Sequence, residues 1–327
     1  MKEMTYSEAI RLAMTEEMRK DENIFIIGED IGIYGGTFGV TKGMIDEFGE
    51  ERIKDAPISE AAIVGAAAGA AVTGMRPIVE LPFLDFITIG MDALVNQAAK
   101  MRYMFGGNEK VPMVVRLPGG SGTGAAAQHS QNLEAWFCHV PGLKVVAPST
   151  PNDAKGLLKS SIRDDNPVVF IESKLLYNTT GMVEEDPEFT IPLGKADIKL
   201  EGSDISLITY GRMLKKALIV AKELAKENIY IEVIDLRTLA PLDKDTIIQS
   251  VKKTGRAIIV HEAVKTGGFG GEIVATIAES DAFDFLKAPI IRIAGVDIPI
   301  PHNKELEKAA VPSEKDIKAG IYRLLNK

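Results

Sequence analysis

Short β-branched runs alternate with longer helical patterns along this chain, and the alternation limits the folds that it can adopt. Runs such as Ile24–Ile27, Ile78–Leu81 and Val168–Ile171 have the length and side chains of buried strands. The segments between them, such as Tyr6–Arg19 and Asn152–Ile162, place apolar residues at helical spacing. Strands that alternate with helices predict the α/β class, in which a mainly parallel sheet is flanked by helices.

The alternation is interrupted once, and the interruption divides the chain. Acidic residues, prolines and threonines cluster around residues 178–195, and this composition is typical of a linker. A second series of strand and helix patterns then runs over residues 205–294. We therefore predict two α/β domains, at residues 1–180 and 196–327, joined by a linker at 181–195.

Charge and composition exclude several classes of protein. The 327 residues carry a formal net charge of −8, and binding nucleic acid requires a basic face, so nucleic acid is not an expected partner. The longest apolar stretch, Ala61–Val72, is too short to span a bilayer, and the charged N-terminus does not resemble a signal peptide. Cys138 is the single cysteine, so no intrachain disulfide can form. We expect a cytoplasmic protein that does not bind a membrane.

A single carboxylate stands before a helical pattern of unusually small residues. Glu60 precedes residues 61–74, which are nearly all small and apolar and include Gly65 and Gly69. Small residues let one helix approach another backbone closely. Glu60 is either a helix-capping carboxylate, which would stabilise the helix by ~0.3–1 kcal/mol, or a buried functional acid, whose burial requires a partner. The residues alone leave both interpretations open.

A glycine-rich loop follows the predicted strand at Val111–Leu117. The loop, residues 118–124, lacks the Gly-Lys-Ser/Thr ending of a P-loop, so it indicates phosphate binding only weakly. His129 lies just beyond the loop, where ligands bind in open α/β sheets, although a lone histidine is more often structural. The glycines of residues 266–272 lack dinucleotide-binding spacing and indicate a tight strand-to-helix turn.

Several short motifs, in the same order along the chain, resemble one family. They are Gly28–Asp30, Pro57–Glu60, Gly74–Ile78, Ala127–Gln131, Pro141–Val146, Asp153–Leu158, Asp164–Pro167 and Ile234–Thr238. The chain resembles the beta subunit of the thiamine-diphosphate-dependent first component of 2-oxo acid dehydrogenase complexes, a family that includes pyruvate, branched-chain 2-oxo acid and acetoin enzymes. The resemblance covers essentially the whole chain. It implies a transketolase-like pyrimidine-binding domain followed by a transketolase C-terminal domain.

The resemblance also implies roles for individual residues. Glu60 and the two spaced glycines after it match the family's glutamate, whose carboxylic acid favours the imino tautomer of the cofactor's aminopyrimidine and so promotes loss of the thiazolium proton. Ile58 and Phe86 are expected to pack against the pyrimidine ring, and Glu29 is expected near the cofactor. His129 matches the family's active-site histidine, which assists acyl transfer to lipoamide.

A second cofactor-binding motif of the family is missing from this chain. Relatives bind the cofactor diphosphate through Mg²⁺ with a Gly-Asp-Gly block, and the sequence contains none. The resemblance therefore implies an alpha subunit that supplies the Mg²⁺ and diphosphate site, in a heterotetramer of two alpha and two beta subunits. It also implies a second partner, a lipoyl-bearing acyltransferase core.

Relatives also hold K⁺ in this subunit, mostly through backbone carbonyl groups. The matching positions are Met113, Ser161, Ile162, Asp164 and Asn166. A plain turn at Asp164–Pro167 is an equally good interpretation of the same residues.

Two other functions remain open alternatives to a lipoamide-coupled dehydrogenase subunit. One is a transketolase- or synthase-like half enzyme that is not coupled to lipoamide, and the other is a non-catalytic α/β scaffold subunit. The motifs also disagree about the substrate. Arg102–Gly107 resembles acetoin-type relatives, whereas His261–Ala263 resembles branched-chain relatives, and the sequence slightly favours acetoin or pyruvate.

Overall fold

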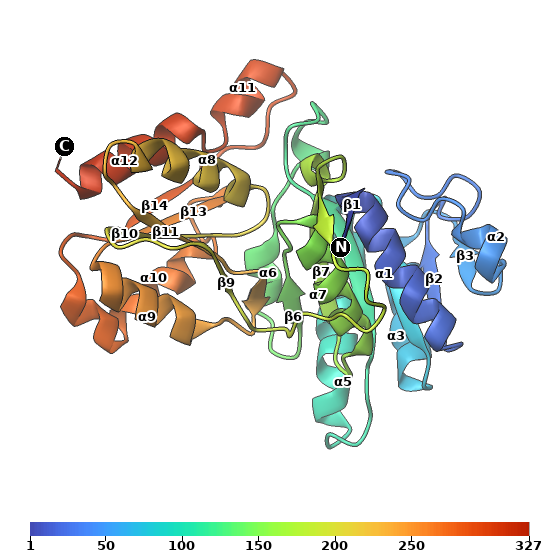
Figure 1. Cartoon of the computed structure of the whole chain (residues 1–327). Helices are drawn as coiled ribbons and strands as arrows, with labels where there is room; N and C mark the ends of the chain where they lie inside the picture. The colour runs from blue at the N-terminus through green and yellow to red at the C-terminus, as the bar shows by residue number, and fades with distance from the viewer. Residues whose placement is uncertain (327) are drawn as a thin grey trace. The chain divides into compact units, whose positions relative to one another are not determined.

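The computed structural model describes residues 1–326, which fold into two compact units. The first unit comprises Met1–Gly119 and Trp136–Leu193, and the second comprises Gly120–Ala135 and the chain from Gly194 onward. Each is a mainly parallel sheet flanked by helices, which confirms the predicted fold class (Figure 1). The sequence placed residues 120–135 in the first domain, whereas in the structure they belong to the second unit.

A parallel sheet forms the centre of the first unit, with the strand order β6-β7-β5-β4-β2-β3. Its strands are β2 (Ile24–Gly28), β3 (Ile53–Asp55), β4 (Arg76–Glu80), β5 (Val114–Gly119), β6 (Lys144–Val146) and β7 (Val168–Ser173). Adjacent strands in this order are all parallel. The strands are β-branched and buried along most of their length, as a sheet covered on both faces requires. Strands β1 (Lys2–Thr5) and β8 (Thr180–Val183) form a separate antiparallel pair.

Helices of the first unit pack in two groups. Helix α1 packs against α7 over a core that includes Ile10, Leu157 and Phe170, whereas α3 packs against α4 and the π-helical η2. Thr5 begins α1 with a capping box. The helical elements numbered up to α7, with η4, are α1 (Tyr6–Lys20), α2 (Met44–Phe48), α3 (Glu60–Val72), η1 (Leu84–Phe86), α4 (Ile87–Met91), η2 (Asp92–Ala98), α5 (Ala99–Met104), η3 (Ala127–His129), α6 (Glu134–Cys138), α7 (Pro151–Arg163) and η4 (Lys174–Leu176).

The predicted linker lies against the first unit for much of its length. Lys155 and Lys159 on α7 are fully buried, and both pair with Glu16 on α1, at 2.9 and 2.6 Å. Their ammonium groups also donate to backbone carbonyl groups of Glu184 and Pro187. Buried cations require such partners, so these residues of the linker are held in place by α7.

The second unit contains a sheet with the strand order β14-β13-β10-β11-β9, in which only the β9–β11 pair is antiparallel. Helices α8 and α12 cover one face and α9 and α10 the other (Figure 1). The strands are β9 (Asp197–Leu200), β10 (Ile205–Thr209), β11 (Ile231–Asp235), β12 (Thr238–Ala240), β13 (Ala257–Val264) and β14 (Ile291–Gly295). The helices are α8 (Met213–Ala225), α9 (Lys244–Thr254), α10 (Gly270–Ala278), η5 (Asp281–Phe285), α11 (Lys304–Ala309) and α12 (Glu314–Leu324). None of the helices in residues 1–326 is long and apolar enough to cross a membrane.

A buried histidine makes the stability of the second unit sensitive to acid. His261 on β13 has no exposed surface and stacks on Tyr210, with ring centroids 6.2 Å apart. Burial, with a smaller contribution from the charge of Arg292, lowers the pKa of His261 to about 4. The unfolded chain therefore takes up a proton near pH 6.5, whereas the folded chain takes it up only near pH 4. Stability is lost as the pH falls through this window.

Comparing the stability of the wild type with that of a variant that has a neutral side chain at position 261 measures this loss. We expect the wild type to lose about 2 kcal/mol more stability than His261→Gln between pH 7.5 and pH 5. Pulse-labelling hydrogen exchange in urea, read on peptides from β10 and β13, measures the unfolding of this unit at both pH values. The exposed His139 provides a control, because His139→Gln should keep the wild-type difference. An equal pH dependence in wild type and His261→Gln would contradict the prediction.

Candidate functional site

The residues predicted to bind the pyrimidine ring lie at one edge of the first sheet. Glu29 directly follows β2, Ile58 and Glu60 follow β3, and Phe86 follows β4. Strand β2 lies between β3 and β4, and all three are parallel. The chain thus changes direction across the sheet at β2, which is where open α/β sheets bind ligands, at the carboxyl ends of the strands.

Glu60 is the first residue of α3 and is only 4% exposed. Ser59, the residue before it, makes no side-chain capping hydrogen bond to the helix. The carboxyl group thus lies at the positive end of the helix dipole but is largely removed from water. A carboxyl group that only caps a surface helix would not need this burial.

Glu29 provides the second carboxyl group of this edge. Its Oε1 atom is buried and has no hydrogen-bond partner among residues 1–326. Burial raises the pKa of Glu29, and the charges of Glu60 and Asp30 raise it further. An unpaired buried oxygen is costly, so the position fits a ligand that carries a hydrogen-bond donor.

The two apolar residues predicted at this edge differ in exposure. Ile58 is 83% exposed, which leaves its side chain available to a ligand or a partner chain. Phe86 is half-buried and meets Phe83 edge-to-face, with ring centroids 5.5 Å apart. Their packing against a pyrimidine ring stays a prediction.

His129 lies in the second unit, on a longer loop of residues 120–131 that includes most of the glycine-rich segment. The Gly120 N–H donates to the Gln131 carbonyl oxygen at 3.1 Å, so both ends of the loop are tied together. Ala126, three residues before His129, has φ +63° and ψ −165°, a backbone conformation that residues other than glycine rarely adopt. Such strain persists only where surrounding contacts hold the backbone in place.

Two carboxylates that the sequence did not single out as site residues hold this loop. Glu262 on β13 accepts hydrogen bonds from the Ser121 N–H at 2.7 Å and from the guanidinium of Arg212. Glu307 on α11 accepts from the N–H groups of Gly122 and Gly124. The amides that a bound phosphate would need therefore already donate to carboxylates of the protein.

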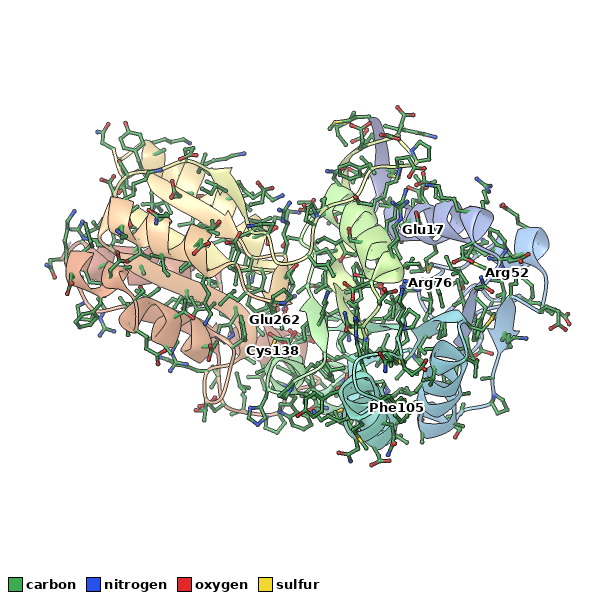
Figure 2. All side chains as sticks on the ribbon, turned by 90° about the horizontal axis from the view of Figure 1, so that it is seen from below. Glu17, Arg52, Arg76, Phe105, Cys138 and Glu262 are labelled. Carbon is green, nitrogen blue, oxygen red and sulfur yellow. The ribbon has the colours of Figure 1, made fainter. Side chains whose placement is uncertain are left out.

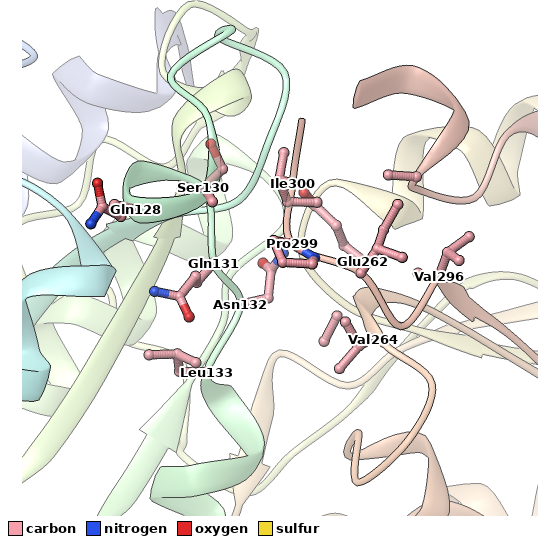
Figure 3. A pocket seen from close by; sticks show the side chains of 15 residues that line it. Gln128, Ser130, Gln131, Asn132, Leu133, Glu262, Val264, Val296, Pro299 and Ile300 are labelled. Atoms are coloured by element: carbon pink, nitrogen blue, oxygen red, sulfur yellow. The ribbon is translucent and has the colours of Figure 1, made fainter. Parts of the chain in front are cut away.

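A cavity of about 440 Å³ borders the loop within the second unit. Figure 3 shows Gln131, Asn132 and Leu133 on the loop side and Val264 and Pro299 on the opposite side. Its lining residues are Ala127, Gln128, Ser130, Gln131, Asn132, Leu133, Glu262, Ala263, Val264, Gly295, Val296, Ile298, Pro299, Ile300 and Ala310. The walls combine apolar side chains with side-chain amides, and two immediate neighbours of His129 are among them.

The positions predicted to bind K⁺ lie around the segment that follows α7. Arg76, labelled in Figure 2, donates to the carbonyl oxygens of Ile162 and Asp164 at 3.0 and 2.8 Å. The Asp164 carboxylate accepts from Asn166 and from Lys144. A cation at these carbonyl groups would have to share them with a guanidinium, so the carbonyl geometry fits K⁺ only in part. Among residues 1–326 no group of three or more His, Cys, Asp or Glu side chains could hold a metal ion.

Comparison with known families defines the class of protein. The family described as "Transketolase, pyrimidine binding domain" matches residues 2–180, and "Transketolase, C-terminal domain" matches residues 194–317. A solved split gene transketolase, an inactive beta4 tetramer, has the same fold. Its TM-score is 0.80 and its sequence identity 21%, over 99% of this chain and 98% of that one. The chain is therefore built from the two transketolase domains that the sequence predicts.

Closer relatives define the family. The chain is 46% identical to the mitochondrial pyruvate dehydrogenase E1 component subunit beta of Saccharomyces cerevisiae, over 99% of this chain and 90% of the relative. It is 48% identical to the pyruvate dehydrogenase E1 component subunit beta of Rickettsia felis, over 98% of both chains. It is 46% identical to the 2-oxoisovalerate dehydrogenase subunit beta of Bacillus subtilis, over 99% of both. The chain belongs to the family of E1 beta subunits of 2-oxo acid dehydrogenases, which confirms the resemblance found in the sequence.

Proposed function

We propose that this chain forms the pyrimidine-binding half of a thiamine diphosphate site and acts, with an alpha subunit, in the oxidative decarboxylation of a 2-oxo acid. The acyl group would pass to lipoamide on an acyltransferase core. One observation carries the proposal: the buried Glu60 lies at the carboxyl edge of the sheet together with Glu29, whose buried Oε1 has no hydrogen-bond partner within the described part of the chain. This is the arrangement that a nitrogen-containing ring with hydrogen-bond donors would complete.

The residues of this edge would have separate tasks. Glu60 would share a proton with a ring nitrogen of the cofactor, and Glu29 would accept a hydrogen bond from it. Ile58 and Phe86 would flank the ring. Thiamine diphosphate, when bound, supplies a nucleophilic carbon for attack on the 2-oxo group. In the second unit, His129 would move a proton during acyl transfer.

Helix α3 supports the proposal of an alpha partner. Its inner residues are buried, but Ala61, Ala62, Ala66 and Gly69 are exposed, so the helix is apolar on the outside as well. A helix that is apolar all round is normally buried. An alpha subunit would cover this face and would contribute the Mg²⁺ and diphosphate site that this sequence lacks. Two copies of each chain remain the proposed stoichiometry.

Calorimetry with and without an alpha subunit tests the cofactor proposal. Thiamine diphosphate with Mg²⁺ should bind the assembled alpha and beta chains and should not bind the beta chain alone. A non-catalytic scaffold would bind in neither sample. Transfer of the acyl group to an isolated lipoyl domain separates the dehydrogenase from a half enzyme that is not coupled to lipoamide, because only the dehydrogenase acylates the domain.

The comparisons support a class of substrate, the 2-oxo acids, but do not distinguish its members. The two pyruvate dehydrogenase relatives are 46% and 48% identical to this chain, and the 2-oxoisovalerate dehydrogenase relative is 46% identical. Overall identity therefore does not separate the two. Turnover measured with pyruvate, branched-chain 2-oxo acids and acetoin would identify the substrate.

Potassium binding and cellular location stay predictions. If Met113, Ser161, Ile162, Asp164 and Asn166 bind K⁺, unfolding should shift to higher temperature in KCl relative to NaCl at equal ionic strength. The domain boundaries predicted at residues 180 and 196, and the cytoplasmic location, rest on the sequence alone.

A further inference from the structure

We propose that Glu307 is a positioning residue for His129. Together with Glu262, it holds the glycine-rich loop by backbone N–H groups, and through the loop it sets the place of the histidine. The inference deepens the function proposed above and rests on the proposed role of His129 in acyl transfer.

The Glu307 side chain reaches the loop from a distant part of the sequence. Its Oε1 accepts from the Gly122 N–H at 2.6 Å, and its Oε2 accepts from the Gly124 N–H at 3.1 Å. Glu307 is only 2% exposed, although it lies on the short helix α11 among charged residues. Hydrogen bonds from amides to a carboxylate are stronger than those between neutral groups, and burial shields them from water.

The loop backbone is shaped to receive this carboxylate. Gly122 has φ +108° and Gly124 has φ +72°, and both turn their N–H groups to one side chain. Backbone amides of one loop that converge in this way form a concave site for an anion. The ring of His302 holds the same segment through a 2.7 Å hydrogen bond between its Nδ1 and the carbonyl oxygen of Gly124.

Glu262 provides a second anchor at the start of the loop. Its Oε1 accepts from both the N–H and the hydroxyl of Ser121, at 2.7 and 3.0 Å. Arg212 neutralises the carboxylate and also donates to the Ser121 hydroxyl at 2.8 Å. The two carboxylates thus fix three backbone amides between Ser121 and Gly124.

His129 is close to these anchors along the chain. Between Gly124 and His129 the backbone passes through Ala126, whose positive φ requires support from outside the residue. The loop is closed behind the histidine by the bond from Gly120 to Gln131. Removing the Glu307 carboxylate frees two amides and allows this segment to relax, which displaces His129. A displacement of about 1 Å at a catalytic group can reduce a rate on the order of 100-fold.

The test uses three variants in the complex with the alpha subunit and thiamine diphosphate. Glu307→Ala removes both acceptors, and Glu307→Gln retains one. Glu305→Ala is the matched control, because Glu305 is on the same helix but is exposed, and its carboxylate pairs with Lys308 on the surface. Hydrogen exchange of residues 120–131 reports on the loop. Two partial reactions, decarboxylation with an artificial electron acceptor and acylation of a free lipoyl domain, report on function.

Glu307→Ala should accelerate exchange in the loop about tenfold or more and reduce lipoyl acylation on the order of 100-fold. Decarboxylation should change far less. Glu307→Gln should fall between wild type and Glu307→Ala in both measurements, and Glu305→Ala should match the wild type. If Glu307→Ala does not fold, the loop exchange and lipoyl acylation of Glu307→Gln, compared with the wild type, provide the test.

Unchanged loop exchange and acylation in Glu307→Ala would overturn the inference, and so would an equal loss in both partial reactions, which indicates a general structural role. His129→Ala separates this failure from a failure of the proposed function. If His129→Ala acylates at the wild-type rate, the proposed role of the histidine is wrong. If His129→Ala is impaired while Glu307→Ala is normal, only the positioning role is wrong.

Discussion

Glu60→Gln, assembled with an alpha subunit and thiamine diphosphate, is expected to lose nearly all turnover of the 2-oxo acid. Glutamine has the size of glutamate and can occupy the same buried place at the start of α3, but it cannot exchange a proton with a ring nitrogen. Groups that transfer protons in a reaction contribute on the order of 100- to 10,000-fold to its rate. The turnover number should decrease by that factor, with little change in thermal stability.

The result separates catalysis from helix capping. If Glu60 only interacts with the helix dipole, the substitution costs at most about 1 kcal/mol of stability and leaves turnover unchanged. Glu8, a carboxylate in the first turn of α1, is the matched control for that role. Glu8→Gln should lower the unfolding midpoint slightly and retain full activity. Wild-type turnover in Glu60→Gln would rule out Glu60 as the proposed acid.

The fold could be predicted where local pattern and tertiary structure agree. Parallel strands buried on both faces must be β-branched and short, so their runs can be recognised without knowing their neighbours. The linker illustrates the opposite case. Its acids and prolines correctly indicate an irregular segment, but its place on α7 depends on Lys155 and Lys159, whose burial no local pattern reveals.

The candidate site also contains residues that could be predicted from the sequence and residues that could not. Glu29 and Glu60 each follow a strand, so the sequence could assign them to one sheet edge, but their electrostatic interaction requires the strand order. Glu307 could not be found, because it contacts a loop more than 180 residues away in the sequence. Glu262 lies in a motif that was noticed for a different reason, and its bond to Ser121 joins residues that are 141 positions apart in the sequence.

Arg116 shows a second kind of interaction that sequence alone does not reveal. It is fully buried on β5 and donates to Glu172 on β7 at 2.7 and 2.9 Å. It also pairs with Glu80, its register partner on β4. Burial and the neighbouring Glu172 raise the pKa of Tyr177, which donates to Glu172 at 2.7 Å. One cation thus compensates two buried carboxylates across three strands.

Arg116→Met is therefore expected to be among the most destabilising substitutions in the first unit. Methionine fills much of the volume but leaves Glu80 and Glu172 buried, close together and without a cation. Removing one partner of a buried ion pair costs about 3–5 kcal/mol, and here two pairs are lost at once. Burial already raises the pKa of Glu80. Without Arg116 this carboxyl group should take up a proton on folding. The loss of stability relative to the wild type should therefore be smaller at acid pH than at neutral pH.

Two further variants show whether charge compensation, and not packing, causes the loss. Arg116→Met combined with Glu80→Gln and Glu172→Gln removes all three charges, and such neutral replacements are often tolerated, so it should recover much of the stability. Arg19→Met breaks the exposed pair with Glu47 and should cost no more than about 1 kcal/mol. Pulse-labelling hydrogen exchange in urea, read on peptides from β5 and β7, measures each value. If the triple variant is no more stable than Arg116→Met, lost packing explains the loss of stability, and Arg116 is not needed to compensate the charges of the buried carboxylates.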